Sequence, residues 1–279
     1  MICNQNDVRT VGDTAQEENE DMKYQHMRSV LEKKFQDAFI EELIPGIIHN
    51  FANPLNGIMG RSKLLQRKLT EIIKKLDAGN NASTLEDNKK LVSDVESISR
   101  EADRLSYMLQ YVTGKICAIS DNTIQKISVS DLIEREMKFF DFYLEFKHSI
   151  KKVVHLERDL PMVQGIPADY SLALSALIRH CMEASKEGFL KEFSISTHYK
   201  NGHICIKIQD RGTPISDDQK KQLFEDSPAA TSFLDMQQDW VLWCAFELLR
   251  RWGVRFEINS DSHWNTIAVF IPAHEAKAV

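Results

Sequence analysis

The residues of this sequence whose types and spacing could do chemistry lie around one histidine. His49 is followed directly by Asn50, and Asn53 and Pro54 come four and five residues after it. A proline inside a helix removes a backbone hydrogen bond and costs about 3 kcal/mol, so its presence here asks for a local reason. A neutral imidazole, with an ordinary pKa of about 6.5, is a competent nucleophile at neutral pH. His49 is therefore either a residue with a local chemical role, such as a nucleophile, or an ordinary packed or surface histidine.

The apolar residues around the histidine predict the helix that must position it. They recur at spacings of four and three over residues 44–76, which is the seam of a helical bundle. Its members are Ile44, Ile48, Phe51, Leu55, Ile58, Leu65, Leu69, Ile72 and Leu76, with Ser62 filling the one gap. Because Ile48 and Phe51 lie on the seam, His49 must point away from it toward solvent. We expect one helix over about 22–76, with the proline loosening the backbone beside the histidine.

A second seam of the same spacing follows a polar stretch at 77–88 that is typical of a turn. Its members are Leu91, Val95, Ile98, Ala102, Leu105, Leu109, Val112 and Ile116. Two helices joined by a short polar loop form an antiparallel hairpin. A lone hairpin cannot bury so continuous a seam, so we expect a second copy to complete a four-helix bundle. The sequence thus predicts a homodimer.

The second half of the chain has a different pattern, in which strands alternate with helices. Segments rich in β-branched residues predict strands at "KKVVHLE", "FSISTHY", "HICIKIQD", "VRFEINS" and "NTIAVFIP". Helical segments lie between them at about 167–187 and 238–252. This mixture predicts an α/β sandwich domain over 123–279.

Composition excludes several classes of function. Among 279 residues there are 35 Lys and Arg against 41 Asp and Glu, so no basic excess exists to bind nucleic acid. The five cysteines form no C-x-x-C pair, which favours reduced thiols and no metal site. No apolar run approaches the roughly 20 residues of a membrane span, and residues 1–21 have no signal-peptide core. We expect a cytoplasmic protein with a disordered leader over 1–21 and the helical hairpin over 22–118.

The segment "HNFANPLNGIMGRSKLL", which begins at His49, resembles the H-box of sensor histidine kinases, H-E-x-x-[TN]-P-L. The resemblance implies that His49 is the phosphoacceptor, with Asn53 at the polar position and Pro54 in the Pro-Leu pair. In the second half, "YSLALSALIRHCMEAS", "IQDRGTP", "LFED" and "DWVLWCAFELLRRWGV" are similar, in order, to the N-box, the first glycine box, the F-box and the helix after the ATP lid. The family fold is a dimeric four-helix bundle followed by an ATPase-type α/β sandwich, and the resemblance covers about 30–272.

The nucleotide-binding positions depart from the family pattern, in which ATP and Mg²⁺ are the cofactors. Asp210 and Gly212 match the adenine-contacting acid and one glycine, but the second glycine is a proline. His180 stands in place of a magnesium-binding asparagine, although hard Mg²⁺ prefers oxygen ligands. Asp239 and Val241 replace the lid glycines, whose bare amides cradle phosphate. We expect a degenerate nucleotide site that binds ATP and Mg²⁺ weakly or not at all.

Several of these residues have a second interpretation. Asp210 and Gly212 are also typical of a strand-to-turn junction, and His180 could be a packed or capping histidine. The position after the phosphoacceptor is usually acidic and acts as a base, whereas Asn50 cannot accept a proton. Asn53 is of the type that the family uses to orient water for dephosphorylation. The residues for phosphotransfer are therefore better kept than those for kinase activity.

Three functions stay open, and we rank them in this order. The first is a histidine phosphotransferase in a phosphorelay, in which His49 exchanges a phosphoryl group with the aspartate of a response-regulator receiver domain without nucleotide. The second is a cytosolic sensor histidine kinase that autophosphorylates with ATP. The third is a non-enzymatic module that binds a response regulator or a kinase. Only the first two are enzymes, phosphotransferases of the histidine kinase family, and none of the three needs nucleic acid or membrane.

Overall fold

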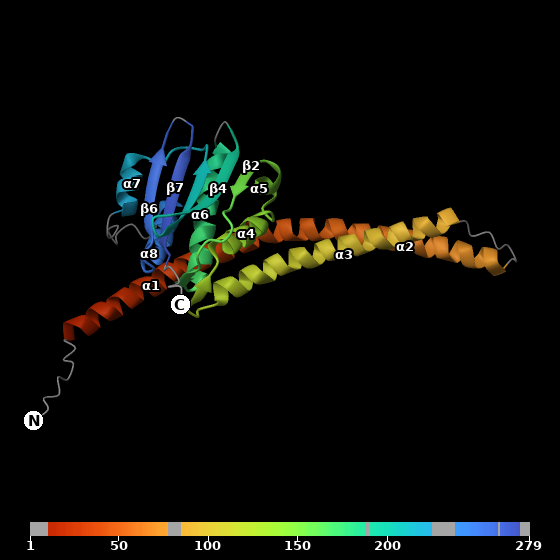
Figure 1. The fold of residues 1–279 in the computed structure, drawn as a ribbon, viewed down its shortest axis with the longest axis horizontal. Coiled ribbons are helices and arrows are strands. Elements are labelled where there is room, and N and C mark those ends of the chain that lie inside the picture. Colours follow the sequence, from red (N-terminus) through yellow and green to blue (C-terminus); the bar gives the residue numbers. More distant parts are fainter. Residues whose placement is uncertain (1–10, 78–84, 188–189, 225–237, 262, 274–279) are drawn as a thin grey trace, which may run out of the picture.

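The computed structural model describes residues 11–77, 85–187, 190–224, 238–261 and 263–273. It consists of a long helical arm that projects from an α/β domain (Figure 1). The chain begins with α1 (Val11–Ala38), continues through a π-helical turn, η1 (Phe39–Leu43), and enters α2 (Ile44–Asp77). A single helical run therefore replaces the shorter helix that the sequence predicted.

The start of α1 corrects the predicted leader. Helix begins at Val11, so the second half of the segment expected to be disordered is helical, while residues 1–10 lie outside the described residues. This stretch is rich in Glu and Gln, which are good helix formers, and acidic residues near a helix N-terminus are favourable. Tyr24 and Met27 are buried against the domain, so the helix is already formed at these residues. Adding turns toward its N-terminus then avoids the unfavourable step of helix nucleation.

The π-helical turn has a cause in the sequence. Pro45 has no backbone N–H, so the carbonyl of Glu41, four residues before it, would have no donor in an α-helical pattern. The N–H of Ile44 instead donates to the carbonyl of Phe39, five residues back. Single π turns of this kind are frequent at functional sites. This one ends about a turn and a half before His49. Pro54, by contrast, lies inside α2 without ending it.

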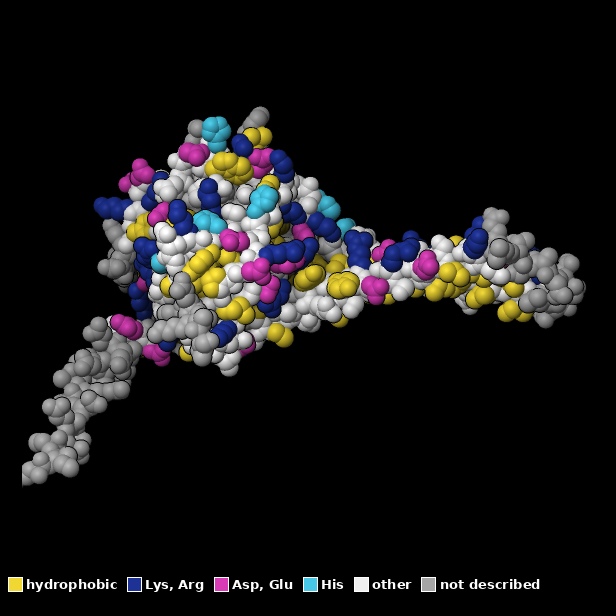
Figure 2. All heavy atoms as spheres, in the orientation of Figure 1, with side chains coloured by type: hydrophobic (Ala, Val, Ile, Leu, Met, Phe, Trp, Pro, Cys, Tyr) yellow, Lys and Arg dark blue, Asp and Glu magenta, His cyan; other side chains and the backbone are white. Residues whose placement is uncertain are grey.

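The predicted hairpin is confirmed, since α3 (Leu85–Ser120) packs along α2. Residues 78–84, within the predicted turn, lie outside the described residues. Between Ile48 and Ile72 on α2, and along α3, the seam divides into two sets with heptad spacing, whereas Ile44 at the start of α2 is exposed. One set is partly or fully buried in the hairpin, and consists of Phe51, Ile58, Leu65 and Ile72 on α2 and Leu91, Ile98, Leu105 and Val112 on α3. The other set is exposed, and consists of Ile48, Leu55, Ser62 and Leu69 on α2 and Val95, Ala102, Leu109 and Ile116 on α3. Figure 2 shows hydrophobic side chains along the lower edge of the arm.

The α/β domain contains a five-stranded sheet in the order β2-β4-β5-β7-β6. The strands are β2 (Lys151–His155), β4 (Glu192–Lys200), β5 (His203–Asp210), β6 (Arg255–Ser260) and β7 (Asn265–Pro272). β2 is parallel to β4 and the other pairs are antiparallel. A small antiparallel pair, β1 (Gln125–Ile127) and β3 (Val163–Gly165), lies beside it. All five predicted strands are confirmed.

Helices cover the sheet and complete the domain. They are α4 (Val129–Phe140), α5 (Leu144–His148), α6 (Pro167–Glu187), α7 (Asp217–Phe224) and α8 (Gln238–Arg250). α6 packs on β4 and β5, and α8 reaches β6 through the stacked rings of Phe246 and Phe256. α1 packs in turn on α6 and α8 and joins the same hydrophobic core. The helical hairpin and mixed α/β domain confirm the predicted fold class for one chain, and α1 adds a layer that the sequence did not predict.

A buried ion pair joins the hairpin to the α/β domain. Lys115 Nζ of α3 lies 2.7 and 2.8 Å from the two carboxylate oxygens of Glu136 on α4, and both side chains are 2% exposed. Ser171 and Ser175 of α6 donate to the same carboxylate at 2.6 and 2.8 Å. The ring of Phe35 on α1 lies 5.3 Å from the ammonium. Burial lowers the pKa of Lys115, and Glu136 opposes that effect. Four helices thus meet at one charge.

We expect Lys115→Met to lower the free energy of unfolding by about 3 to 5 kcal/mol, because the Glu136 carboxylate would stay buried without its counter-charge. The double variant with Glu136→Gln should recover part of the loss, since no charge then stays buried. Urea denaturation would measure these differences. The matched control is Lys138→Met on the exposed face of α4, which should cost less than about 1 kcal/mol. Equal small losses at both lysines would contradict this account.

Candidate phosphotransfer site

His49 stands on the exposed surface of α2, as its place beside the seam predicted. Asn53, four residues on, is also exposed and lies on the same helix face. Pro54 is buried, so it packs rather than reaching toward the histidine. The site therefore presents an imidazole and one amide side chain to solvent.

Asn50 lies in a different environment from its neighbour. Its side chain is 4% exposed, and its Nδ2 donates to the carbonyl of Gly46 at 2.9 Å. Its Oδ1 accepts a hydrogen bond from Nζ of Lys147, in the last turn of α5. The residue that takes the place of the family's base is thus a buried amide that contacts the second domain. The lysine was not among the predicted site residues.

The α/β domain meets α2 closely on the side of Asn50. A Cβ added to Gly46 would lie 1.8 Å from the carbonyl oxygen of Phe142, which only glycine allows. The rings of Phe51 and Phe142 pack edge to face with centroids 6.2 Å apart. The α4–α5 connection is therefore fitted against α2 before and after His49, and it leaves the histidine uncovered.

Asp210 and Gly212 form a turn that the rest of the domain satisfies. Asp210 is 3% exposed, and its Oδ1 accepts hydrogen bonds of 2.8 Å from the Gly212 N–H and from Asn265 Nδ2. The same Asn265 amide donates to the Gly212 carbonyl at 2.9 Å. A Cβ on Gly212 would lie 2.0 Å from the carbonyl oxygen of Ala184 in α6. The strand-to-turn interpretation accounts for both residues, and sequence reasoning missed Asn265.

The Asp210 carboxylate also affects the pKa of a neighbouring thiol, that of Cys181. Burial raises the pKa of Cys181, and the charge of Asp210 and a hydrogen bond with it act in the same direction. The carboxylate that would contact adenine in the family is thus surrounded by three partners from its own chain. Asn265 is opposite Asp210 in the β5–β7 pairing, which explains how it reaches the turn.

His180 does not belong to the Asp210–Gly212 turn. It lines a cleft between α6, α8 and the α1–η1 segment. The cleft has a volume of about 440 Å³, and Lys34, Asp37 and Glu41 form its wall on the α1–η1 side. Arg179, next to the histidine, pairs with Glu42 of η1 and lies 2.7 Å from Glu183. Within the described ranges, no group of three His, Cys, Asp or Glu side chains could hold a metal ion. Val241 lines this cleft too, and both positions predicted for the lid glycines, Asp239 and Val241, lie within α8. Residues 225–237, just before α8, lie outside the described residues.

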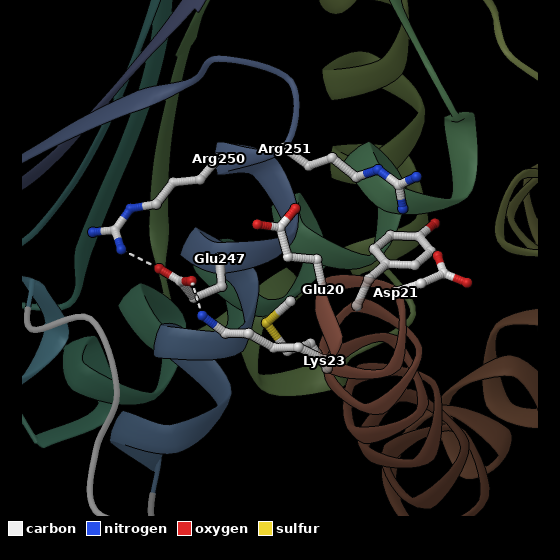
Figure 3. Close-up of a pocket in the computed structure, with 8 residues that line it drawn as sticks. Glu20, Asp21, Lys23, Glu247, Arg250 and Arg251 are labelled. Atoms are coloured by element: carbon white, nitrogen blue, oxygen red, sulfur yellow. Dashed lines mark hydrogen bonds and ion pairs between the residues drawn. The ribbon is translucent and has the colours of Figure 1, made fainter. Parts of the chain in front are cut away.

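Helix α1 is attached to the domain through a second polar cluster. Tyr24 donates to Asp169 Oδ1 at 2.9 Å, and the Trp252 indole donates to Oδ2 at 3.0 Å. Burial raises the pKa of Asp169. Nearby, Lys23 of α1 lies 2.9 Å from Glu247 of α8, which also pairs with Arg250. Figure 3 shows Lys23, Glu247 and Arg250, which line a pocket between α1 and α8. α1 is thus part of the domain rather than a tail.

Histidine kinase domains are among the solved structures similar to this chain. The histidine kinase AdeS of Acinetobacter baumannii is 15% identical, over 77% of this chain and 96% of that one, with a TM-score of 0.43. Full-length ShkA in complex with AMPPNP is 14% identical over 82% of this chain and 45% of that one, with a TM-score of 0.46. A structure described as a bacterial phosphotransferase is 13% identical over 81% and 93%, with a TM-score of 0.39.

No protein-family model and no curated protein sequence matches the chain. Across the ranges that the structure describes, none of the helices has the length and apolar character needed to cross a membrane.

Gly46→Ala should lower the free energy of unfolding by about 1 to 3 kcal/mol, because the new methyl group meets the Phe142 carbonyl. Gly60→Ala in the same helix is the matched control, since nothing lies within 4 Å of its added Cβ. That variant should raise the free energy of unfolding by about 0.5 to 1 kcal/mol, as alanine restricts the unfolded chain and favours helix. Denaturant titration of both proteins gives the comparison. Opposite signs are expected, and the same sign in both would show that the domain does not rest on α2 at this point.

Proposed function

We propose that this chain is a two-component signalling protein of the cytoplasm that carries a phosphoryl group on His49. In the forward step an imidazole nitrogen attacks the phosphorus of an aspartyl phosphate on a receiver domain. A bond forms between nitrogen and phosphorus while the bond to the aspartate oxygen breaks, and the carboxylate leaves. The reverse step delivers the group to the aspartate of another receiver. The receiver supplies Mg²⁺, so this chain needs no metal site of its own.

The observation that carries the proposal is the contrast between His49 and Asn50. The imidazole is exposed, whereas the next side chain is a buried amide bonded to Gly46 and Lys147. An amide cannot take the proton that a base at this position would accept during autophosphorylation. Exchange with an aspartyl phosphate places no such demand, because the acyl phosphate is already an activated donor. The site fits transfer better than it fits phosphorylation by ATP.

The second domain supports the same conclusion. Asp210 already accepts hydrogen bonds from Gly212 and Asn265, so adenine would have to compete with groups of this chain for the carboxylate. Among the described residues, the cleft at His180 is lined by the mixed charges of Lys34, Asp37, Glu41 and Arg179, whereas phosphate favours free backbone amides. Both features favour weak or absent binding of ATP and Mg²⁺.

Autophosphorylation with ATP is the second candidate function. It is favoured by the order of elements, since the β5 turn with Asp210 and Gly212, the α6 helix and the α8 helix all stand where the family resemblance requires them. On that alternative the nucleotide would displace Asn265 from Asp210. The third candidate is a non-enzymatic module that binds a response regulator or a kinase. It would need only the surface of the hairpin for this binding.

A receiver domain of the source organism can be phosphorylated on its aspartate with ³²P-acetyl phosphate. We expect this domain to transfer the ³²P label to the wild-type chain. His49→Ala should lose at least about a hundredfold in transfer, because the nucleophile is absent. Denaturing gels with autoradiography would follow the label. The matched control is His198→Ala, an exposed histidine on β4, which should transfer normally. Transfer of label to the His49→Ala protein would contradict the proposal. If this variant accepted no label but kept the signalling output of the wild type, the docking module would be favoured.

The homodimer belongs to the same proposal. The exposed set of the seam repeats every seven residues on both α2 and α3, which is the pattern of a helix that packs against a second pair. A second copy related by a two-fold axis would cover all of these side chains at once. Four helices would then enclose one apolar core, with His49 outside it.

Val95→Glu should convert the dimer into a monomer, because it places a charge in the exposed half of the seam, where the side chain is 51% exposed in one chain. Val92→Glu is the matched control, since that side chain is 57% exposed but lies off the seam. Sedimentation equilibrium would report the mass of two chains for the wild type and the control, and of one chain for Val95→Glu. A monomeric wild type would remove the homodimer from the proposal.

A further inference from the structure

Lys147 connects the α/β domain to the residue beside the phosphoacceptor. Its ammonium donates to the Asn50 side chain, although the two residues are 97 positions apart in the sequence. The side chain is partly buried at the foot of the arm. An ammonium has three N–H donors, and this hydrogen bond uses one of them.

The surroundings of Lys147 leave its charge uncompensated. Burial lowers the pKa of Lys147, and Arg104 of α3 and Lys152 of β2 act in the same direction. Asp141 opposes them, but that carboxylate already pairs with Lys152 at 2.6 Å. Among the described residues no carboxylate lies within ion-pair distance of Lys147 itself. The site therefore holds a partly buried positive charge against Asn50, the residue that follows His49.

Because Asn50 is a neutral amide, it does not neutralise the positive charge of Lys147. An acidic residue at this position would form an ion pair with Lys147 and cancel it. Asparagine accepts the same hydrogen bond while remaining neutral, so it orients the ammonium without neutralising it. A phosphoryl group on the adjacent residue carries a charge of about −1.5 to −2. Charges act on one another over roughly 8 Å in physiological salt, and Lys147 is hydrogen-bonded to the residue that directly follows His49.

We infer that Lys147 is a positioning residue that balances the phosphoryl charge on His49, with Asn50 as its neutral anchor. The inference rests on the proposed function and extends it, because it gives the α/β domain a part in the phosphorylated state. On this inference the α/β domain acts on the hairpin through the ammonium of Lys147 and not through a bound nucleotide.

Phosphoramidate can test the inference without any receiver. The imidazole nitrogen of His49 attacks its phosphorus, the phosphorus–nitrogen bond of the donor breaks, and ammonia leaves with the proton. ³¹P NMR then follows the titration of the phosphohistidine signal, which is assigned by its absence in His49→Ala. Because Lys147 stabilises the dianion, Lys147→Gln should raise the pKa of this phosphoryl group by about 0.2 to 0.7. Lys147→Arg should leave the pKa close to that of the wild type.

Two further variants separate charge from structure. Asn50→Asp should raise the phosphoryl pKa as Lys147→Gln does, because the new carboxylate pairs with the lysine. Lys151→Gln removes an equal charge from the edge strand, where Lys151 pairs with Glu192 at 2.8 Å, and should change nothing. Equal titrations in the wild type and Lys147→Gln would overturn the inference and leave the proposed function intact, and so would equal shifts in the Gln and Arg variants. No His49 signal from the folded wild type would overturn both.

Discussion

The buried charge of Lys115 is the constraint on which the arrangement of this molecule depends. Its ammonium is surrounded by the Glu136 carboxylate, the hydroxyls of Ser171 and Ser175 and the ring of Phe35, so α1, α3, α4 and α6 must meet there. A charge buried this deeply is tolerated only while every partner is in place. The pair therefore fixes the α/β domain at the base of the hairpin. The close approach of Phe142 to Gly46 then fixes it against α2 as well.

This double attachment determines how each half of the molecule can act. The domain is held against the Asn50 side of α2, and His49 is left open to a partner from solution. Inside the domain, the groups that the family uses for adenine are engaged in a turn with Asn265. Helix α1 closes the layer over α6 and α8 through Tyr24 and Asp169. The second domain thus supports α2, and Lys147 is the point at which it contacts the residue beside His49.

Much of this could be predicted from sequence, because periodicity is a local signal. The spacing of apolar residues gave both helices of the hairpin and the exposure of His49, and β-branched runs gave all five strands of the sheet. The missed features depend on contacts between distant segments. Lys147 meets Asn50 across 97 residues and Asn265 meets Asp210 across 55. α1 looked like a leader because its acidic start shows no apolar face. Pro45 was a usable signal for an irregular turn at this point, since its missing N–H leaves the carbonyl of Glu41 without its α-helical donor.

The central claim is that phosphate reaches His49 from a receiver and not from ATP. Incubating the purified protein with γ-³²P-ATP and Mg²⁺, beside His49→Ala, tests it most directly, with a phosphorylated receiver domain as the positive donor. The account predicts label on His49 from the receiver and none from ATP. Label from ATP that disappears in His49→Ala would contradict it. That result would mean that a nucleotide can displace Asn265 from Asp210 and that the chain is an autokinase.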